Sequence, residues 1–186
     1  VLAKDAKGAM VFVGSSSLHG FNTTQNGFKR VGDLLSVRML NEIPVGQRDT
    51  IVNRGIGGDT LQNASATRLE RDVFDTAGVS SVVVWVTNDL SSRSADEIIA
   101  NYQELIAKAH AKGINVYCPT WIPGAQSFQA NLSGERAKLN DWILNSGECD
   151  GVADYNAEVE APGGLTFLPQ YNSGDSIHSN DAGHAL

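Results

Sequence analysis

The run Val82-Val83-Val84-Trp85-Val86, followed by Thr87-Asn88-Asp89, is the stretch that decides the fold. Its first five positions are all apolar, which is typical of a strand covered by other layers on both faces. Four further apolar runs predict strands at 9–13, 50–53, 114–118 and 152–155. Helical patterns alternate with these runs, so the sequence predicts an α/β fold with a parallel sheet.

The clearest predicted helix follows Ser94. Ser94 and Glu97 form an S-x-x-E capping box, in which each side chain satisfies an amide of the first turn. Apolar residues then recur at helical spacing, and Gly113 supplies a left-handed stop. Weaker patterns predict helices at 31–40, 61–74 and 134–144, the last with Glu135 and Arg136 at a solvated start. Because no repeat, linker or low-complexity segment interrupts the pattern, we expect residues 1–186 to form one domain.

Composition limits the classes of function. The chain has 186 residues, 41% of them hydrophobic and 19% charged, which suits one globular domain with a sizeable core. The net charge is -7, and the scattered Lys and Arg residues never gather into a basic tract, which argues against a nucleic-acid partner. No apolar stretch reaches the length of a membrane span.

The two cysteines carry a separate expectation. Cys118 would lie at the carboxyl end of one predicted strand and Cys149 before the amino end of its neighbour, roughly 15 Å apart and beyond bridging range. We therefore expect two thiols and no disulfide. The chain begins at Val1 without a signal-like apolar region, as a mature secreted form or a trimmed chain would, and we favour secretion.

Polar residues follow the predicted strands, where the loops of a parallel sheet converge. Ser16 lies in the glycine-flanked turn Gly14-Ser15-Ser16-Ser17-Leu18-His19-Gly20, and Gly58 lies in Asn53-Arg54-Gly55-Ile56-Gly57-Gly58-Asp59-Thr60. Asn88 follows the central strand, and Asp175-Ser176-Ile177-His178 lies near the end. A serine hydroxyl, a histidine base, a carboxylate that orients it and hydrogen-bond donors for an oxyanion are the parts of acyl transfer.

These four segments resemble the sequence blocks of the SGNH (GDSL-like) hydrolase family, over Met10 to His184. The chain looks most similar to the actinobacterial-type, often secreted members. The resemblance implies a three-layer α/β/α sandwich with a flavodoxin-like parallel sheet of about five strands. It also implies Ser16 as nucleophile, His178 as base, Asp175 as its orienter, and an oxyanion hole formed by the Ser16 and Gly58 amides and the Asn88 side chain.

The resemblance further implies a serine esterase that needs no metal and no organic cofactor. Short-chain acyl esters are the expected substrates, because a small domain without a lid has little room for a long tail. Acetylated carbohydrate is expected from the resemblance alone. The sequence does not indicate an oligomeric state.

Two positions depart from the family pattern. Ser15 stands where the family usually has Asp, and Val86 replaces the glycine before Thr87-Asn88-Asp89. A β-branched residue disfavours positive φ, so Val86 would either re-aim Asn88 or narrow the acyl pocket. The chain also reaches Leu186 where a final helix should begin, after Asn180 and Asp181. A missing final helix would uncover one face of the sheet, so either the chain is truncated or something else packs there.

Three other functions remain open. Gly55-Ile56-Gly57 before a helix could bind a nucleotide, although Thr60 occupies the third glycine position of that motif. Asp175, His178, Asp181 and His184 could hold a catalytic metal, although no remote ligand cluster accompanies them. The alternative we weigh most is a non-catalytic SGNH-like carbohydrate-binding or structural protein, which Val86 and the abrupt end would fit.

The remaining polar and aromatic candidates are expected to be mostly structural. His19 could line the mouth of the cleft, whereas His110 would face solvent late in a helix. Trp121 and Tyr171 could flank a sugar ring, but packing is the default expectation for both. Arg54 and Asp89 are expected to be structural.

Overall fold

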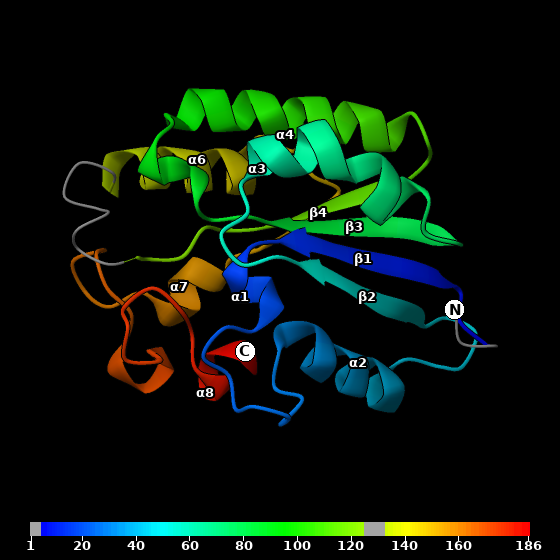
Figure 1. The fold of residues 1–186 in the computed structure, drawn as a ribbon, viewed down its shortest axis with the longest axis horizontal. Helices are drawn as coiled ribbons and strands as arrows, with labels where there is room; N and C mark the ends of the chain where they lie inside the picture. The colour runs from blue at the N-terminus through cyan, green and yellow to red at the C-terminus, as the bar shows by residue number, and fades with distance from the viewer. Residues whose placement is uncertain (1–4, 125–132) are drawn as a thin grey trace.

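A computed structural model describes residues 5–124 and 133–186. These residues form one five-stranded parallel sheet with the strand order β2-β1-β3-β4-β5 (Figure 1). The strands are β1 Gly8–Gly14, β2 Asp49–Gly55, β3 Val79–Trp85, β4 Asn115–Pro119 and β5 Gly151–Ala153. This order is that of flavodoxin-like folds, so the predicted fold class is confirmed.

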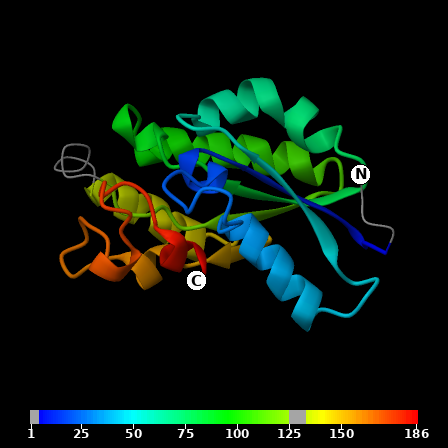
Figure 2. The same cartoon turned by 60° about the horizontal axis from the view of Figure 1, so that its bottom comes forward.

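Helices cover both faces of the sheet, which makes three layers (Figures 1 and 2). One layer contains α3 Leu61–Asn63, the π-helix η1 Ala64–Phe74, α4 Ala95–His110 and α6 Ser133–Asn145. The opposite layer contains α1 Ser16–His19, α2 Val31–Glu42, α7 Tyr155–Val159 and α8 Asp181–His184. Two short 3₁₀ turns, η2 Asp89–Ser91 and η3 Pro169–Tyr171, complete the order.

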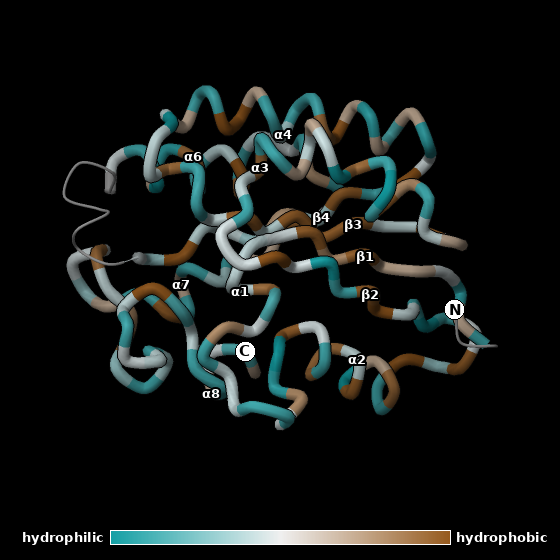
Figure 3. Tube along the Cα trace, in the orientation of Figure 1, coloured by the Kyte–Doolittle hydropathy of each residue, from teal (hydrophilic) through white to brown (hydrophobic). Residues whose placement is uncertain are grey.

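The central strand β3 feeds both cores by alternation. Val82 and Val84 are fully buried in the cluster between the sheet and the layer of η1, α4 and α6. Val83 and Trp85 belong to a second cluster on the opposite face. Strands β1 and β3 are accordingly among the most hydrophobic segments of the trace in Figure 3. This double burial is the reason that the run is apolar at every position.

The last strand is shorter than predicted, and this overturns the expectation for the cysteines. Tyr155 begins α7 instead of ending a strand, because the Asp154 side chain caps that helix by accepting the Ala157 amide. Strand β5 pairs only with the carboxyl half of β4, where Cys118 lies opposite Val152. The chain that enters β5 therefore comes close to Cys118. Cys118 and Cys149 form a disulfide with a Cα–Cα distance of 6.1 Å, so the prediction of two thiols was wrong.

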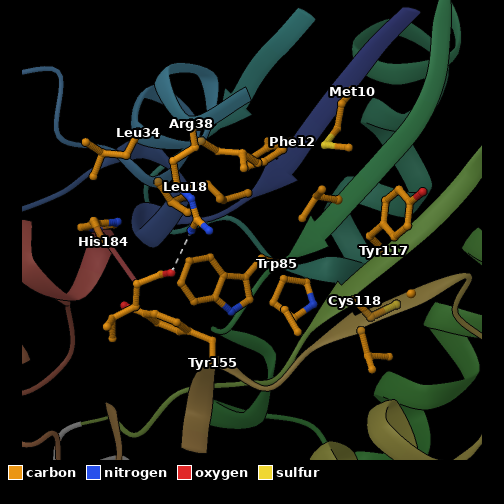
Figure 4. Close-up of a pocket in the computed structure, with 18 of the residues that line it drawn as sticks. Met10, Phe12, Leu18, Leu34, Arg38, Trp85, Tyr117, Cys118, Tyr155 and His184 are labelled. Carbon is orange, nitrogen blue, oxygen red and sulfur yellow. Dashed lines mark hydrogen bonds between the residues drawn. The ribbon is translucent and has the colours of Figure 1, made fainter. Parts of the chain in front are cut away.

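One face of the sheet carries an open apolar cavity of about 460 Å³ between α2, the strands and α8. Phe12, Trp85, Tyr117 and Tyr155 are among its lining residues (Figure 4). Helix α8 runs for a single turn, capped by Asn180, at the rim of this cavity. None of the described helices is long and apolar enough to cross a bilayer.

Candidate active site

The turn that carries Ser16 is set by close packing at the end of β1. A Cβ atom at Gly14 would collide with the carbonyl oxygen of Trp85 and with the Leu18 side chain, so only glycine fits there. Ser15 is the N-cap of α1 with extended backbone angles, and Ser16 is the first residue of the helix. The amides of a first helical turn have no partner within the helix, so the Ser16 hydroxyl lies beside unpaired backbone donors.

A chain of two short hydrogen bonds links the three predicted relay residues. The Nε2 atom of His178 lies 2.7 Å from the Ser16 hydroxyl, and its Nδ1 atom lies 2.6 Å from Oδ2 of Asp175. The imidazole is largely buried, at 8% exposure. Residues 162 positions apart in the chain therefore meet at the carboxyl end of the sheet.

The environment of Asp175 fixes the tautomer of the histidine. Burial opposes ionisation of this carboxyl, but hydrogen bonds from His178 and from the amides of Ile177 and His178 outweigh it and lower its pKa to about 2. Its Oδ1 also accepts a hydrogen bond from the Ser173 hydroxyl, and its Oδ2 accepts one from the side-chain amide of Asn22 at 2.7 Å. An ionised carboxylate can only accept, so Nδ1 of the neutral imidazole carries the proton and Nε2 is free to accept from Ser16.

The predicted oxyanion donors face the same space. Gly58 adopts a φ of +78°, which disfavours any other residue, and a Cβ there would point into open space. Asn88 donates one amide hydrogen to the carbonyl of Asp59 at 2.8 Å, which leaves its second hydrogen for a ligand. Ser16, Gly58, Asn88 and His178 all line one cavity.

A buried ionic network holds the Gly58 loop in place. Arg68 of η1 is 4% exposed and pairs with Asp59 and Asp72, while it also donates to the carbonyl of Arg54. The fully buried Asp89 accepts the amides at the start of α3, directly after this loop. Burial raises the pKa of Asp89, and these backbone amides oppose that rise. Asp89 thus serves structure, as expected, while Arg54 contributes only its backbone carbonyl to this network, and Arg68 supports the loop in a way that the sequence did not reveal.

The cavity at Ser16 has a volume of about 400 Å³. Its walls are largely apolar, with Leu90, Trp121, Ile122 and Ile177 among them, and Arg136 also lines it. Arg136 is only 6% exposed because it pairs with Glu160 and donates to Asn156, so the expectation of a solvated position was wrong. Trp121 is held by its indole hydrogen bond to Tyr102, so it packs in the core and lines the cavity as well.

The two residues that depart from the family pattern, Val86 and Ser15, are both buried in the core. Val86 is fully buried among the residues that face α4, its φ is not positive, and it does not line the cavity. The expected narrowing of the acyl pocket by Val86 is therefore wrong. Ser15 is also fully buried, with its hydroxyl 3.5 Å from that of Thr87.

The remaining candidates lie away from the cavity. His19 is exposed and Tyr171 packs against the second core cluster; neither lines the cavity. His110 bonds Asp150 at the end of α4. Asp181 accepts from Thr24, and His184 is buried beside the other cavity. Within residues 5–124 and 133–186, no group of three or more His, Cys, Asp or Glu residues is placed to hold a metal ion.

The sequence matches the family model described as the GDSL-like Lipase/Acylhydrolase family over residues 12–186. The chain belongs to this family. Membership makes GDSL-type ester hydrolysis its class of activity. Curated proteins gave no match by sequence.

Solved structures of GDSL-type and other esterases share the fold. A GDSL-like lipase from Bacteroides thetaiotaomicron superposes with a TM-score of 0.75 at 19% identity, covering 96% of this chain and 82% of its own. The esterase EstA from a Pseudoalteromonas species gives 0.72 at 15% identity, covering 95% and 90%. A variant of an acetyl-xylooligosaccharide esterase from Geobacillus gives 0.71 at 16%, covering 96% and 90%. At these identities the likeness establishes the fold alone.

Two further residues contact the predicted relay, and the sequence did not point to either. Phe21 packs its ring on the His178 imidazole, with centroids 4.7 Å apart, and Asn22 bonds Asp175. Asn22 has a φ of +64°, an angle that asparagine tolerates better than most residues. The available signal was the Gly20-Phe21-Asn22 turn just after α1.

Proposed function

We propose that this protein is a serine esterase that hydrolyses short-chain acyl esters, acetyl esters of carbohydrates among them, through an acyl-enzyme intermediate. The observation that carries the proposal is the continuous hydrogen-bonded path from Ser16 through His178 to Asp175, with links of 2.7 and 2.6 Å. A serine hydroxyl becomes an effective nucleophile only when a base accepts its proton during attack. This path supplies that base in the required tautomer.

In the proposed acylation, Oγ of Ser16 attacks the ester carbonyl carbon while Nε2 of His178 takes the hydroxyl proton. The carbonyl oxygen becomes an oxyanion that accepts from the amides of Ser16 and Gly58 and from the Asn88 side chain. Each donor placed for that charge contributes roughly 3 kcal/mol to the barrier reduction. The ester bond to the alcohol then breaks, and His178 returns the proton to the leaving oxygen.

In the proposed deacylation, a water molecule attacks the acyl-enzyme carbonyl while His178 takes a proton from it. The bond to Oγ of Ser16 then breaks, His178 returns the proton to Oγ, and the carboxylic acid leaves. The ionised Asp175 stabilises the imidazolium in both halves, because its pKa of about 2 keeps it charged throughout the working pH range. The cavity of about 400 Å³ suits a small ester, and its Arg136 offers a polar contact to a hydroxylated ligand. Because the acetyl-xylooligosaccharide esterase has this fold, acetylated sugars are the first carbohydrate esters to test.

Replacement of the nucleophile tests the proposal. We expect Ser16→Ala to lower kcat for p-nitrophenyl acetate by at least about a thousandfold, because the base then has no hydroxyl to activate. Ser36→Ala serves as the matched control, since that hydroxyl bonds Gly32 within α2. A fluorophosphonate probe should label the wild type at Ser16 and leave Ser16→Ala unlabelled.

The competing non-catalytic role has a different signature. Equal hydrolysis rates in wild type and Ser16→Ala would refute the nucleophile assignment. Binding of acetylated sugars without turnover, unchanged in Ser16→Ala, would favour a carbohydrate-binding or structural protein. The burial of Val86 away from the cavity removes one of the two reasons for that alternative.

A further inference from the structure

Phe21 is an exposed aromatic ring held against the proposed catalytic base. Its side chain lies 4.7 Å from the imidazole of His178, centroid to centroid, at an interplanar angle of 46°. It nevertheless remains 52% exposed. Phe21 therefore covers one side of the imidazole and presents the rest of its ring to whatever approaches His178 from solvent.

Hydrogen bonds hold the chain on both sides of Phe21. The amides of Gly20 and Phe21 both donate to the carbonyl of Ser16 at 3.0 Å. On the other side, the Asn22 side chain donates to Asp175 at 2.7 Å and to Ser173 at 3.1 Å. The backbone of Phe21 is thus held between the Ser16 and Asp175 ends of the relay, and its ring contacts His178 between them.

The chemistry of ester cleavage indicates which part of the substrate would approach the Phe21 ring. The acyl carbon bonds to Oγ of Ser16, and its oxyanion turns toward Gly58 and Asn88. The leaving oxygen must lie next to Nε2 of His178, which returns a proton to it. The cavity of about 400 Å³ is lined by Ser16 and His178 but not by Phe21, so Phe21 stands outside the space assigned to the acyl group.

We propose that Phe21 forms a subsite for the leaving alcohol and favours alcohols that carry a ring with an apolar face, such as an aromatic ring or a sugar ring. This inference rests on the proposed serine esterase mechanism and adds its alcohol specificity. The acyl group occupies the cavity, and the ring of the alcohol stacks on the exposed part of Phe21. Phe21 is a specificity-determining residue and takes no part in proton transfer.

The test compares esters that share an acyl group and differ in the alcohol. Benzyl acetate, a monoacetylated methyl glucoside and methyl acetate all release unactivated alcohols and give the same acetyl-enzyme. We expect Phe21→Ala to lower kcat/KM for the two ring-bearing esters about fivefold, the size of one aromatic contact. For methyl acetate we expect a change of less than about twofold, and Phe21→Trp should restore the preference.

Phe28→Ala is the matched control, because Phe28 is 75% exposed in the same segment and makes no ring contact with His178. It should leave all three rates unchanged. A loss confined to benzyl acetate would limit the subsite to aromatic alcohols, and a loss confined to the glucoside would limit it to sugar rings.

An equal loss on all three esters, or a shifted pH profile of kcat/KM, would mean that Phe21 only supports His178 and would overturn the inference. Unchanged rates in Phe21→Ala would overturn it as well. If the wild type hydrolyses none of the esters, or if Ser16→Ala hydrolyses them equally well, the proposed function itself fails. Wild-type turnover without alcohol discrimination by Phe21 refutes the subsite alone.

Discussion

At the scale of single residues, the site depends on groups that hold the relay as well as on the relay itself. Asp175 accepts five hydrogen bonds, and only one of them comes from the imidazole of His178. The spacing Asp175-Ser176-Ile177-His178 predicted that one bond, because a carboxylate three residues before a histidine can reach Nδ1. The bond from Asn22 links positions 153 apart, and no local pattern reports such a contact.

Asn22 provides a prediction at this scale. Asn22→Gly removes the amide donor to Asp175 and still accommodates the φ of +64°. We expect kcat to fall about tenfold with KM little changed, because a hydrogen bond to a charged group that steadies the imidazolium is lost. Steady-state kinetics on p-nitrophenyl acetate, with the thermal midpoint as a check on folding, would measure it. An unchanged kcat would show that the remaining donors suffice for Asp175.

At the scale of elements, strands buried on both faces were predicted well and the edge strand was not. Residues 82–85 of the apolar run fall on β3, because burial on both faces leaves a clear apolar pattern in the sequence. Strand β5 has three residues, and two of them are exposed. Its hydrophobic pattern therefore predicts neither where the strand ends nor how it pairs with β4. The error over Cys118 and Cys149 follows from that missing register. The π-helical winding of η1 was equally invisible, because 61–74 has the same apolar pattern as an α-helix.

The disulfide yields the prediction for this scale. The Cys118–Cys149 bridge closes a 31-residue separation that contains all of α6 and ties β4 to the segment before β5. We expect Cys118→Ala with Cys149→Ala to lower the free energy of unfolding by about 2–4 kcal/mol, since the unfolded chain regains that freedom. Denaturant unfolding of the oxidised wild type, the reduced wild type and the double variant would measure the loss. Identical midpoints with and without reductant would contradict it.

At the scale of the whole molecule, the two faces of the sheet differ in cover. Helices η1, α4 and α6 close one face over the larger core cluster. The opposite face keeps the apolar cavity of about 460 Å³, where Arg38 donates to the carbonyl of Leu186 across the opening (Figure 4). The cavity at Ser16 lies at the carboxyl ends of the strands, as the topology requires. The cavity at Ser16 and the apolar cavity on the face of the sheet therefore lie in separate parts of the fold.

His184, at the edge of that incomplete face, couples the stability of the molecule to pH. It is 3% exposed, and neither ring nitrogen has a hydrogen-bond partner among the described residues. Burial lowers the pKa of His184 from 6.5 to about 4, and the charge of Asp181 only partly opposes this. Between these two values the unfolded chain binds a proton that the folded chain does not. Unfolding free energy should therefore fall as the pH falls from 6.5 to 4, by up to about 3 kcal/mol.

His184→Phe isolates this contribution, because a phenyl ring fills a similar volume and cannot be protonated. We expect the variant to be more stable than the wild type at pH 4.5. In the wild type, protonation of His184 stabilises the unfolded chain at this pH, and the variant has no group at this position that can be protonated. The difference between the two proteins should shrink as the pH rises to 7.5, because His184 is neutral in both states of the wild type there. Denaturant unfolding at half-unit pH steps would compare the curves. Parallel curves across this range would mean that His184 is protonated as readily in the folded protein as in the unfolded chain.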